Sequence, residues 1–185
     1  GGIFSRQAKS ITISPQMREC FGIAEGSLTP DQLISALLVS PVDLLWNGGI
    51  GTYVKASSEN NLEVGDKAND SLRVNGKQLR CKVIGEGGNL GFTQLARIEY
   101  GMTGGISLTD FIDNSAGVDC SDHEVNIKIL LNALMAEKVL KVDDRNSLLE
   151  SMTESVSKMV LENNYRQTQA ISLCEAEADA RSIEY

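Results

Sequence analysis

Residues 83–94 read VIGEGGNLGFTQ, in which four glycines, one glutamate and one asparagine follow a short apolar run. Glycine weakens a strand end unless the backbone must turn sharply there or another group must approach closely. At the carboxyl end of a strand in an α/β sheet, the approaching group is often a ligand. The stretch therefore predicts a strand over 79–84, a ligand-binding loop over 85–91 and a following helix.

The same order of strand, glycine-rich loop and helix is predicted on both sides of this stretch. Upstream, the apolar run VDLLW at 42–46 leads directly into NGGIGT at 47–52. Downstream, GGISLTDFID at 104–113 predicts a strand, and residues 114–118 predict a third loop. Strands that alternate with helices pair in parallel through right-handed crossovers. We therefore expect three neighbouring parallel strands with all three loops at one edge of the sheet.

Capping residues predict where the first helices begin and end. Thr29 can cap a helix with Pro30 at its first position, and Gln32 completes a capping box. The helix after the second loop, at 93–101, is expected to stop at Gly101. These signals favour an α/β fold.

The last third of the sequence is expected to be helical. Ser121 and Glu124 form a second capping box, which predicts a helix that opens there and runs to about residue 140. Asp143 or Asp144 is expected to start a final amphipathic helix.

Composition excludes several classes of protein. The 185 residues carry 17 basic and 25 acidic side chains, for a net charge of −8, with no basic cluster, so nucleic acid is not an expected partner. No apolar run has the length of a membrane span, and the first ten residues lack signal-peptide features and read as the interior of a longer chain. One histidine and four scattered cysteines argue against zinc and predict buried or half-buried free thiols in a reducing cytoplasm: Cys20, Cys81, Cys120 and Cys174.

The glycine loops do not match the two best-known phosphate-binding motifs. In a Gly-x-Gly-x-x-Gly fingerprint that starts at Gly85, the third glycine falls on Leu90, and Gly76-Lys77 is followed by glutamine, as no Walker loop would be. Composition alone therefore supports a ligand edge of an α/β sheet, and a tight turn without a ligand is the alternative for each loop.

The polar residues of the loops differ in what they can do. The Asn89 amide can donate and accept at once, which suits a ribose hydroxyl or a carboxamide. Asn114 occupies the equivalent place after the third predicted strand, where an ordinary Asx turn is the alternative. Glu86, between glycines, is interpreted as a buried, hydrogen-bonded acid. Ser121 is sufficiently explained as a cap, although the helix amides there could attract a carboxylate.

Three long segments together resemble a known family. VDLLWNGGIGTYVKAS, RCKVIGEGGNLGFTQLARIEY and DFIDNSAGVDCSDHEVNIKILLN resemble the second half of the coenzyme domain of the large bacterial NAD-specific glutamate dehydrogenases. The resemblance covers most of residues 1–135, in order and with matching spacing. It implies a partial Rossmann-like three-layer domain with parallel strands over 1–121, the C-terminal part of an NAD-binding domain, followed by C-terminal helices over 122–185.

The smaller glutamate dehydrogenases offer a residue-level comparison. Their Pro-Ala-Ala-Leu-Glu-Asn is similar in position to NGGIGT, their Ala-Glu-Gly-Ala-Asn to GEGGN, and their Asn-Ala-Gly-Gly-Val to NSAGV. The resemblance implies that Asn89 lies near the nicotinamide ribose, Asn114 near the nicotinamide, and Ser121 at the substrate carboxylate. The cofactor-binding residues implied in this way are Gly48, Gly49, Glu86, Gly87, Gly88, Asn89 and Asn114.

The family reaction is oxidative deamination of L-glutamate to 2-oxoglutarate and ammonia, with hydride passing to NAD. The resemblance implies a cytoplasmic enzyme that forms homo-oligomers. The family takes its catalytic lysine and aspartate from a substrate domain, and its pyrophosphate-binding fingerprint from an earlier segment, so no catalytic residue is expected in this chain. Two alternatives stay open: a regulatory or interaction module on an α/β scaffold, and another amino-acid dehydrogenase.

Overall fold

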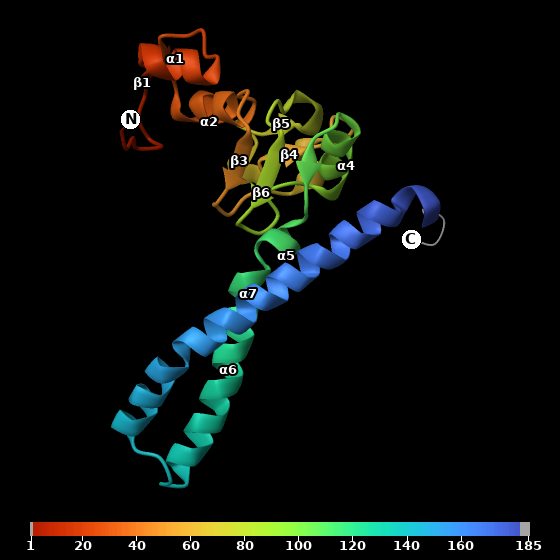
Figure 1. Cartoon of the computed structure of the whole chain (residues 1–185). Coiled ribbons are helices and arrows are strands. Elements are labelled where there is room, and N and C mark those ends of the chain that lie inside the picture. Colours follow the sequence, from red (N-terminus) through yellow and green to blue (C-terminus); the bar gives the residue numbers. More distant parts are fainter. Residues whose placement is uncertain (1, 182–185) are drawn as a thin grey trace. The chain divides into compact units, whose positions relative to one another are not determined.

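The computed structural model describes residues 2–181, which form two compact units that divide between Asp113 and Asn114. The first unit has an α/β architecture and the second is a pair of long helices (Figure 1). The strands are β1 (Ile11–Thr12), β2 (Ser27–Leu28), β3 (Leu44–Asn47), β4 (Val54–Lys55), β5 (Val74–Asn75), β6 (Val83–Glu86) and β7 (Ile106–Ser107). The helices are α1 (Pro15–Phe21), α2 (Pro30–Leu38), α3 (Asn61–Val64), α4 (Gln94–Met102), α5 (Asp110–Asp113), α6 (Ser115–Ala136) and α7 (Val142–Arg181), with short 3₁₀ turns η1 (Lys67–Asn69) and η2 (Gly76–Gln78).

The central sheet confirms the expected parallel pairing. Its strand order is β3-β6-β7, so strands that follow one another as predicted also lie next to one another. Asn47 pairs with Glu86, which brings the last residues of β3 and β6 to the same level. The loops that follow these two strands therefore leave the sheet at one edge, as predicted.

The expected boundaries of the second and third strands are wrong. β6 begins at Val83, so the predicted strand residues 79–82 lie outside it, and β7 contains only Ile106 and Ser107. The acidic end of the third predicted strand is the helix α5, in which Asp110 and Asp113 lie one turn apart. The predicted third loop at 114–118 is also wrong, because α6 begins at Ser115.

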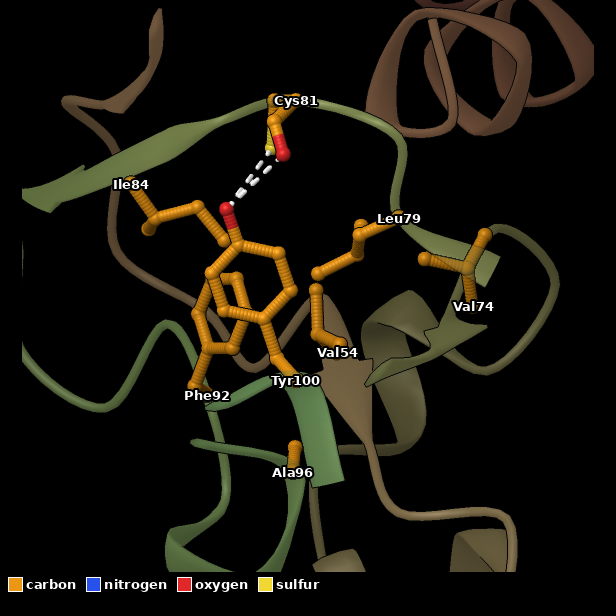
Figure 2. Close-up of a cluster of buried hydrophobic side chains, with 8 residues drawn as sticks. All are labelled: Val54, Val74, Leu79, Cys81, Ile84, Phe92, Ala96 and Tyr100. Atoms are coloured by element: carbon orange, nitrogen blue, oxygen red, sulfur yellow. Dashed lines mark hydrogen bonds between the residues drawn. The ribbon is translucent and has the colours of Figure 1, made fainter. Parts of the chain in front are cut away.

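The main core packs α4 against Ile84 of the central sheet and against Val54 and Val74 of the separate parallel pair β4–β5 (Figure 2). Tyr100 of α4 is 1% exposed, and its hydroxyl donates to the Cys81 carbonyl at 2.9 Å. Phe92, directly after the second glycine loop, is also buried in this cluster. A buried aromatic ring of this size contributes about 1.5–3 kcal/mol through the apolar surface that it removes from water. The core thus fixes the far end of the loop.

The other face of the central sheet is exposed. Leu44 and Trp46 of β3 pair with Val83 and Gly85 of β6, and Ile106 pairs with Val83, so these side chains share a face. Trp46 is 59% exposed and Ile106 is 62% exposed. Parallel sheets in α/β proteins usually have both faces covered. The first unit therefore presents one covered and one bare sheet face.

Helix ends show where local sequence signals were sufficient. Thr29 caps α2 with Gln32 in a reciprocal capping box, as predicted. Gly101, by contrast, lies inside α4, and the left-handed residue that follows the helix is Gly104. The predicted cap at Ser121 is wrong, since Ser121 lies inside α6 and is exposed.

The second unit is an antiparallel pair of helices, in which α7 extends over 40 residues (Figure 1). Leu131 of α6 and Val160 of α7 are buried, and the Asn163 amide of α7 donates to Asp119 of α6 at 2.8 Å. Lys138, which has a positive φ of 59°, lies in the turn that separates the two helices.

Side-chain exposure corrects one expectation about the cysteines. Cys81 is buried, but Cys20, Cys120 and Cys174 are exposed, and all four are free thiols. Among the residues that the structure describes, no helix combines the length and the apolar character that crossing a bilayer would demand.

Candidate functional site

Two glycine-rich loops lie at the carboxyl edge of the central sheet. The first glycine loop is residues 47–52, which begins at the last residue of β3, and the second glycine loop is residues 85–91, which begins within β6. Backbone hydrogen bonds join them at both ends. The Gly88 amide donates to the Asn47 carbonyl at 3.1 Å, and the Gly91 carbonyl accepts from the amides of Tyr53 and Val54 at 2.9 and 3.2 Å. The loops therefore form one connected surface.

Close packing within the protein requires glycine at position 88 and favours it at position 87. A Cβ atom at Gly88 would lie 2.5 Å from the Gly49 carbonyl oxygen, so only glycine fits without a backbone shift. A Cβ atom at Gly87 would lie 2.4 Å from the Trp46 ring, which crosses the strand end at this point. Packing between the loops and against the Trp46 indole thus explains why these two positions are glycine without reference to a ligand.

Glu86 lies buried beneath the second loop, as interpreted from the sequence. It is 0% exposed, and its Oε1 accepts from the Phe92 amide at 3.1 Å. Arg97 of α4 donates to both carboxylate oxygens, from Nε at 2.7 Å and from Nη2 at 2.9 Å. Such a bidentate contact fits the planar guanidinium and offsets the charge of the buried Glu86 carboxylate. Glu86 consequently holds the loop through a hydrogen bond from the buried side of the loop.

Two aspartates of α5 continue this network. Asp110 accepts from Arg97 Nη2 at 3.2 Å through one oxygen and from the Leu90 amide at 2.8 Å through the other. Asp113 accepts from the Glu86 amide at 2.8 Å. Leu90 has a positive φ of 57°, a conformation that costs free energy for a residue with a side chain. The Asp110 contact helps to hold Leu90 in it.

The electrostatics of this network follow from burial and charge pairing. Burial raises the pKa of Asp113, and the neighbouring Asp110 adds to that rise, while the Glu86 amide and Arg97 oppose it. Burial would lower the pKa of Arg97, but the hydrogen-bonded Glu86 carboxylate and the two aspartates outweigh burial and raise it. Arg97 therefore stays charged among the carboxylates.

The first glycine loop is fixed at its far end by a different arginine. The Arg73 side chain is 0% exposed and donates to the Thr52 carbonyl at 2.8 Å and to Asp70 at 2.6 Å. Asp66 accepts from the Thr52 amide at 2.8 Å. The hydrogen bond from Asn69 and that from the Thr52 amide lower the pKa of Asp66. This second cluster orders the point where the loop joins β4.

The middle of the first loop is open to solvent. Gly48 and Gly49 are exposed, and Ile50 is 88% exposed. Beside this loop lies a cavity of about 310 Å³, lined by Trp46, Asn47 and Tyr53 together with residues of α2 and the N-terminal segment. Asn47 Nδ2 is buried in the first unit and has no hydrogen-bond partner among the described residues.

The predicted coenzyme residues of the first unit come together at this edge. Asn89 is exposed on the second loop, above the buried Glu86. Asn114 directly precedes α6 and Ser121 lies within it, so both belong to the second unit. The residues brought together are Gly48, Gly49, Glu86, Gly87, Gly88 and Asn89.

Sequence reasoning missed the charged residues that hold the loops. Arg97 could have been found, because an acid interpreted as buried requires a cation or several donors, and a helix was predicted beside it. Asp110 and Asp113 were hidden by the wrong assignment of residues 104–113 to a strand, which sends alternate side chains to opposite faces. In α5 the two side chains instead both reach the second loop.

Comparisons of the sequence with known proteins identify the family. The family model for the catalytic domain of bacterial NAD-glutamate dehydrogenase matches residues 1–174. The chain belongs to this family. It is 61% identical over 185 residues to the NAD-specific glutamate dehydrogenase of Pseudomonas aeruginosa and 61% identical over 175 residues to that of Halomonas elongata.

A third relative, the NAD-specific glutamate dehydrogenase of Mycobacterium tuberculosis, is 53% identical over 185 aligned positions. These relatives align with 100%, 95% and 96% of this chain, respectively. The chain spans only 11% of the length of each of them. The resemblance inferred from the sequence is therefore confirmed, and the activity of a whole enzyme must be argued separately.

Proposed function

We propose that this chain is the C-terminal part of the coenzyme-binding domain, with the following helices, of an NAD-specific glutamate dehydrogenase. The enzyme oxidatively deaminates L-glutamate to 2-oxoglutarate and ammonia. Under this proposal residues 1–121 serve the NAD-binding domain and residues 122–185 form a helical segment.

One observation carries the proposal: two glycine loops, bonded to each other, leave parallel strands at the same edge of the sheet. Ligands of open α/β sheets bind outside the carboxyl ends of the strands. The exposed backbone of Gly48 and Gly49 and the exposed Asn89 amide are the groups that a coenzyme would meet at this edge. The residues present therefore fit NAD.

The roles of the individual residues follow from where they lie. Gly48 and Gly49 offer a surface without side chains, and Asn89 offers a donor and an acceptor to the nicotinamide ribose. Gly87, Gly88 and Glu86 act indirectly, because they set the shape of the second loop. Asn114 is proposed to lie near the nicotinamide and Ser121 to bind the substrate carboxylate.

The chemistry of hydride transfer belongs to the bound NAD, and the protein orients it. This chain contributes orientation only, because the lysine and aspartate of the family reaction lie in another domain. We further propose that the enzyme is a cytoplasmic homo-oligomer whose partners are its small-molecule substrates, with no nucleic acid and no membrane.

The first test compares the isolated chain with the full-length enzyme that contains it. The purified 185-residue chain should produce no NADH from glutamate above a blank preparation, because it lacks catalytic residues and a pyrophosphate loop. The full-length enzyme should reduce NAD with glutamate and should bind NADH in a fluorescence titration. Activity of the isolated chain would refute the proposal that the catalytic residues lie in another domain. NAD reduction by the full-length enzyme with another amino acid in place of glutamate would favour a different amino-acid dehydrogenase.

A further inference from the structure

The second glycine loop is held from below by an alternating set of hydrogen bonds. The amides of residues 86, 88, 90 and 92 all donate, to Asp113, the Asn47 carbonyl, Asp110 and Glu86, respectively. Three of these four acceptors are carboxylates, which come from β6 and α5. The backbone path of the loop therefore depends on where these carboxylates lie.

Arg97 fixes two of the three carboxylates at once. Its guanidinium contacts both oxygens of Glu86 and one oxygen of Asp110, and the Arg97 side chain is only 10% exposed. Each carboxylate uses the remaining capacity of its oxygens for a loop amide, Phe92 for Glu86 and Leu90 for Asp110. The contacts thus run from the arginine through a carboxylate to the loop backbone.

Charge makes this arrangement depend on the arginine. The Glu86 side chain is 1% exposed and that of Asp110 is 13% exposed, so neither is well solvated. Without a cation, two poorly solvated carboxylates would repel each other and would lose the partner that offsets their desolvation. Their oxygens would then shift, and the amides of Leu90 and Phe92 would shift with them.

We propose that Arg97 is a positioning residue for the coenzyme, acting through Glu86 and Asp110 on the backbone of the second glycine loop. This inference rests on the proposed function and goes beyond it, because Arg97 lies in α4 and outside the loop itself. Displacement of a binding loop by about 1 Å can reduce activity on the order of a hundredfold.

The test uses the full-length enzyme with Arg97→Met and Arg97→Lys. Arg97→Met should weaken NADH binding by about 10- to 100-fold, as measured by fluorescence titration. Arg97→Lys keeps the charge but loses the two-pronged contact, so part of the affinity should return. The KM for glutamate at saturating NAD should stay within about twofold of wild type, since the loop is proposed to contact only the coenzyme.

Tyr100→Phe is the matched control. Tyr100 lies three residues further along α4 and donates a buried hydrogen bond to the Cys81 carbonyl, so its loss destabilises the same helix without touching the loop. A melting curve should show loss of stability in this variant with NADH affinity kept.

Three results would overturn the inference. The first is that Arg97→Met binds NADH within about twofold of wild type, and the second is that Tyr100→Phe loses as much NADH affinity as Arg97→Met. The third is that neither Arg97 variant folds, which would make Arg97 a residue of the core. If the wild-type enzyme itself does not bind NADH, the proposed function fails and the inference fails with it.

Discussion

The two glycine loops share one edge of the sheet but are held in opposite ways. The second loop is bound along its length, with its amides directed to buried carboxylates and its end fixed by Phe92 in the core. The first loop is fixed at its far end, where Arg73 and Asp66 hold Thr52, and its middle is open to solvent.

The difference shows that a glycine-rich sequence does not by itself define a ligand contact. In the second loop, Gly88 is glycine because the Gly49 carbonyl leaves no space for a side chain. In the first loop, Gly48 has space around it apart from the Trp46 side chain. The closely packed loop therefore supplies a fixed shape, and the open loop supplies accessible backbone.

Removal of the anchor of the first loop should have the largest effect on stability. Arg73→Met leaves the carboxylates of Asp66 and Asp70 without their buried cation and the Thr52 carbonyl without its donor. We expect a loss of about 3 kcal/mol in the free energy of unfolding of the 185-residue chain. Urea denaturation followed by the fluorescence of Trp46, the single tryptophan, measures it.

Arg166→Met serves as the control for this measurement. Arg166 pairs with Glu162 on exposed α7, so its replacement should cost less than about 0.5 kcal/mol. Equal losses in the two variants would show that Arg73 is not a specific anchor.

The exposed tip of the second loop should matter for activity rather than for folding. Asn89→Ala removes a side-chain amide that can pair with a ribose or a carboxamide. In the full-length enzyme, kcat/KM should fall on the order of ten- to a thousandfold, or about 1.4–4 kcal/mol. The melting curve should be unchanged, since Asn89 is exposed. An unchanged kcat/KM would make Asn89 a turn residue, and a collapsed melting transition would make its role structural.

The contact between the loops can be broken at a single methyl group. Gly88→Ala places a Cβ atom 2.5 Å from the Gly49 carbonyl oxygen, so the two loops must separate. We expect about 1–3 kcal/mol of lost stability in urea denaturation. Gly48→Ala is the paired variant, because the nearest atom there is Trp46 Nε1 at 3.3 Å on a side chain that can move. If both alanines cost the same, the loops are not held together at Gly88.

Sequence patterns predicted what depends on local chemistry and on strand order. The capping box at Thr29 and the parallel neighbours β3 and β6 were predicted because caps and crossovers have strong local rules. The cap at Ser121 failed because its capping box lies within a longer helix, and packing between α6 and α7 outweighs a local alternative. A capping motif cannot show whether the helix has already begun.

The candidate site was predictable in its loops and not in its supports. The position of Asn89 after a strand follows from the glycine pattern, but the role of Arg97 depends on which helix face meets the sheet. That face is set by the burial of Tyr100 and Ala96 in the core, a property of the whole unit. Charged supports beneath a loop therefore become visible only when the packing is known.

The smallest expected effect concerns the pH dependence of stability that arises from Asp113, which accepts a hydrogen bond from the Glu86 amide of the second loop. Burial raises the pKa of Asp113 above its ordinary value near 3.8, so the folded state holds this proton more tightly than the unfolded state. Below the ordinary value both states are protonated and Asp113 contributes nothing. As the pH rises through that value, the unfolded state ionises first, and stability falls until the folded state also ionises. At neutral pH the full cost of burying the carboxylate is present.

Asp113→Asn should therefore gain stability relative to wild type between about pH 4 and neutral pH, and not at lower pH. The asparagine oxygen can still accept a hydrogen bond from the Glu86 amide, so this contact with the second loop is kept. Urea denaturation of both proteins across this pH range measures the difference, with the exposed Asp122→Asn in the second unit as control. The opposite result would be a wild-type protein that gains stability relative to the variant as the pH rises. It would mean that the attraction between Asp113 and Arg97 outweighs the cost of burying the Asp113 carboxylate, and that charge pairing contributes more than packing to holding the second loop.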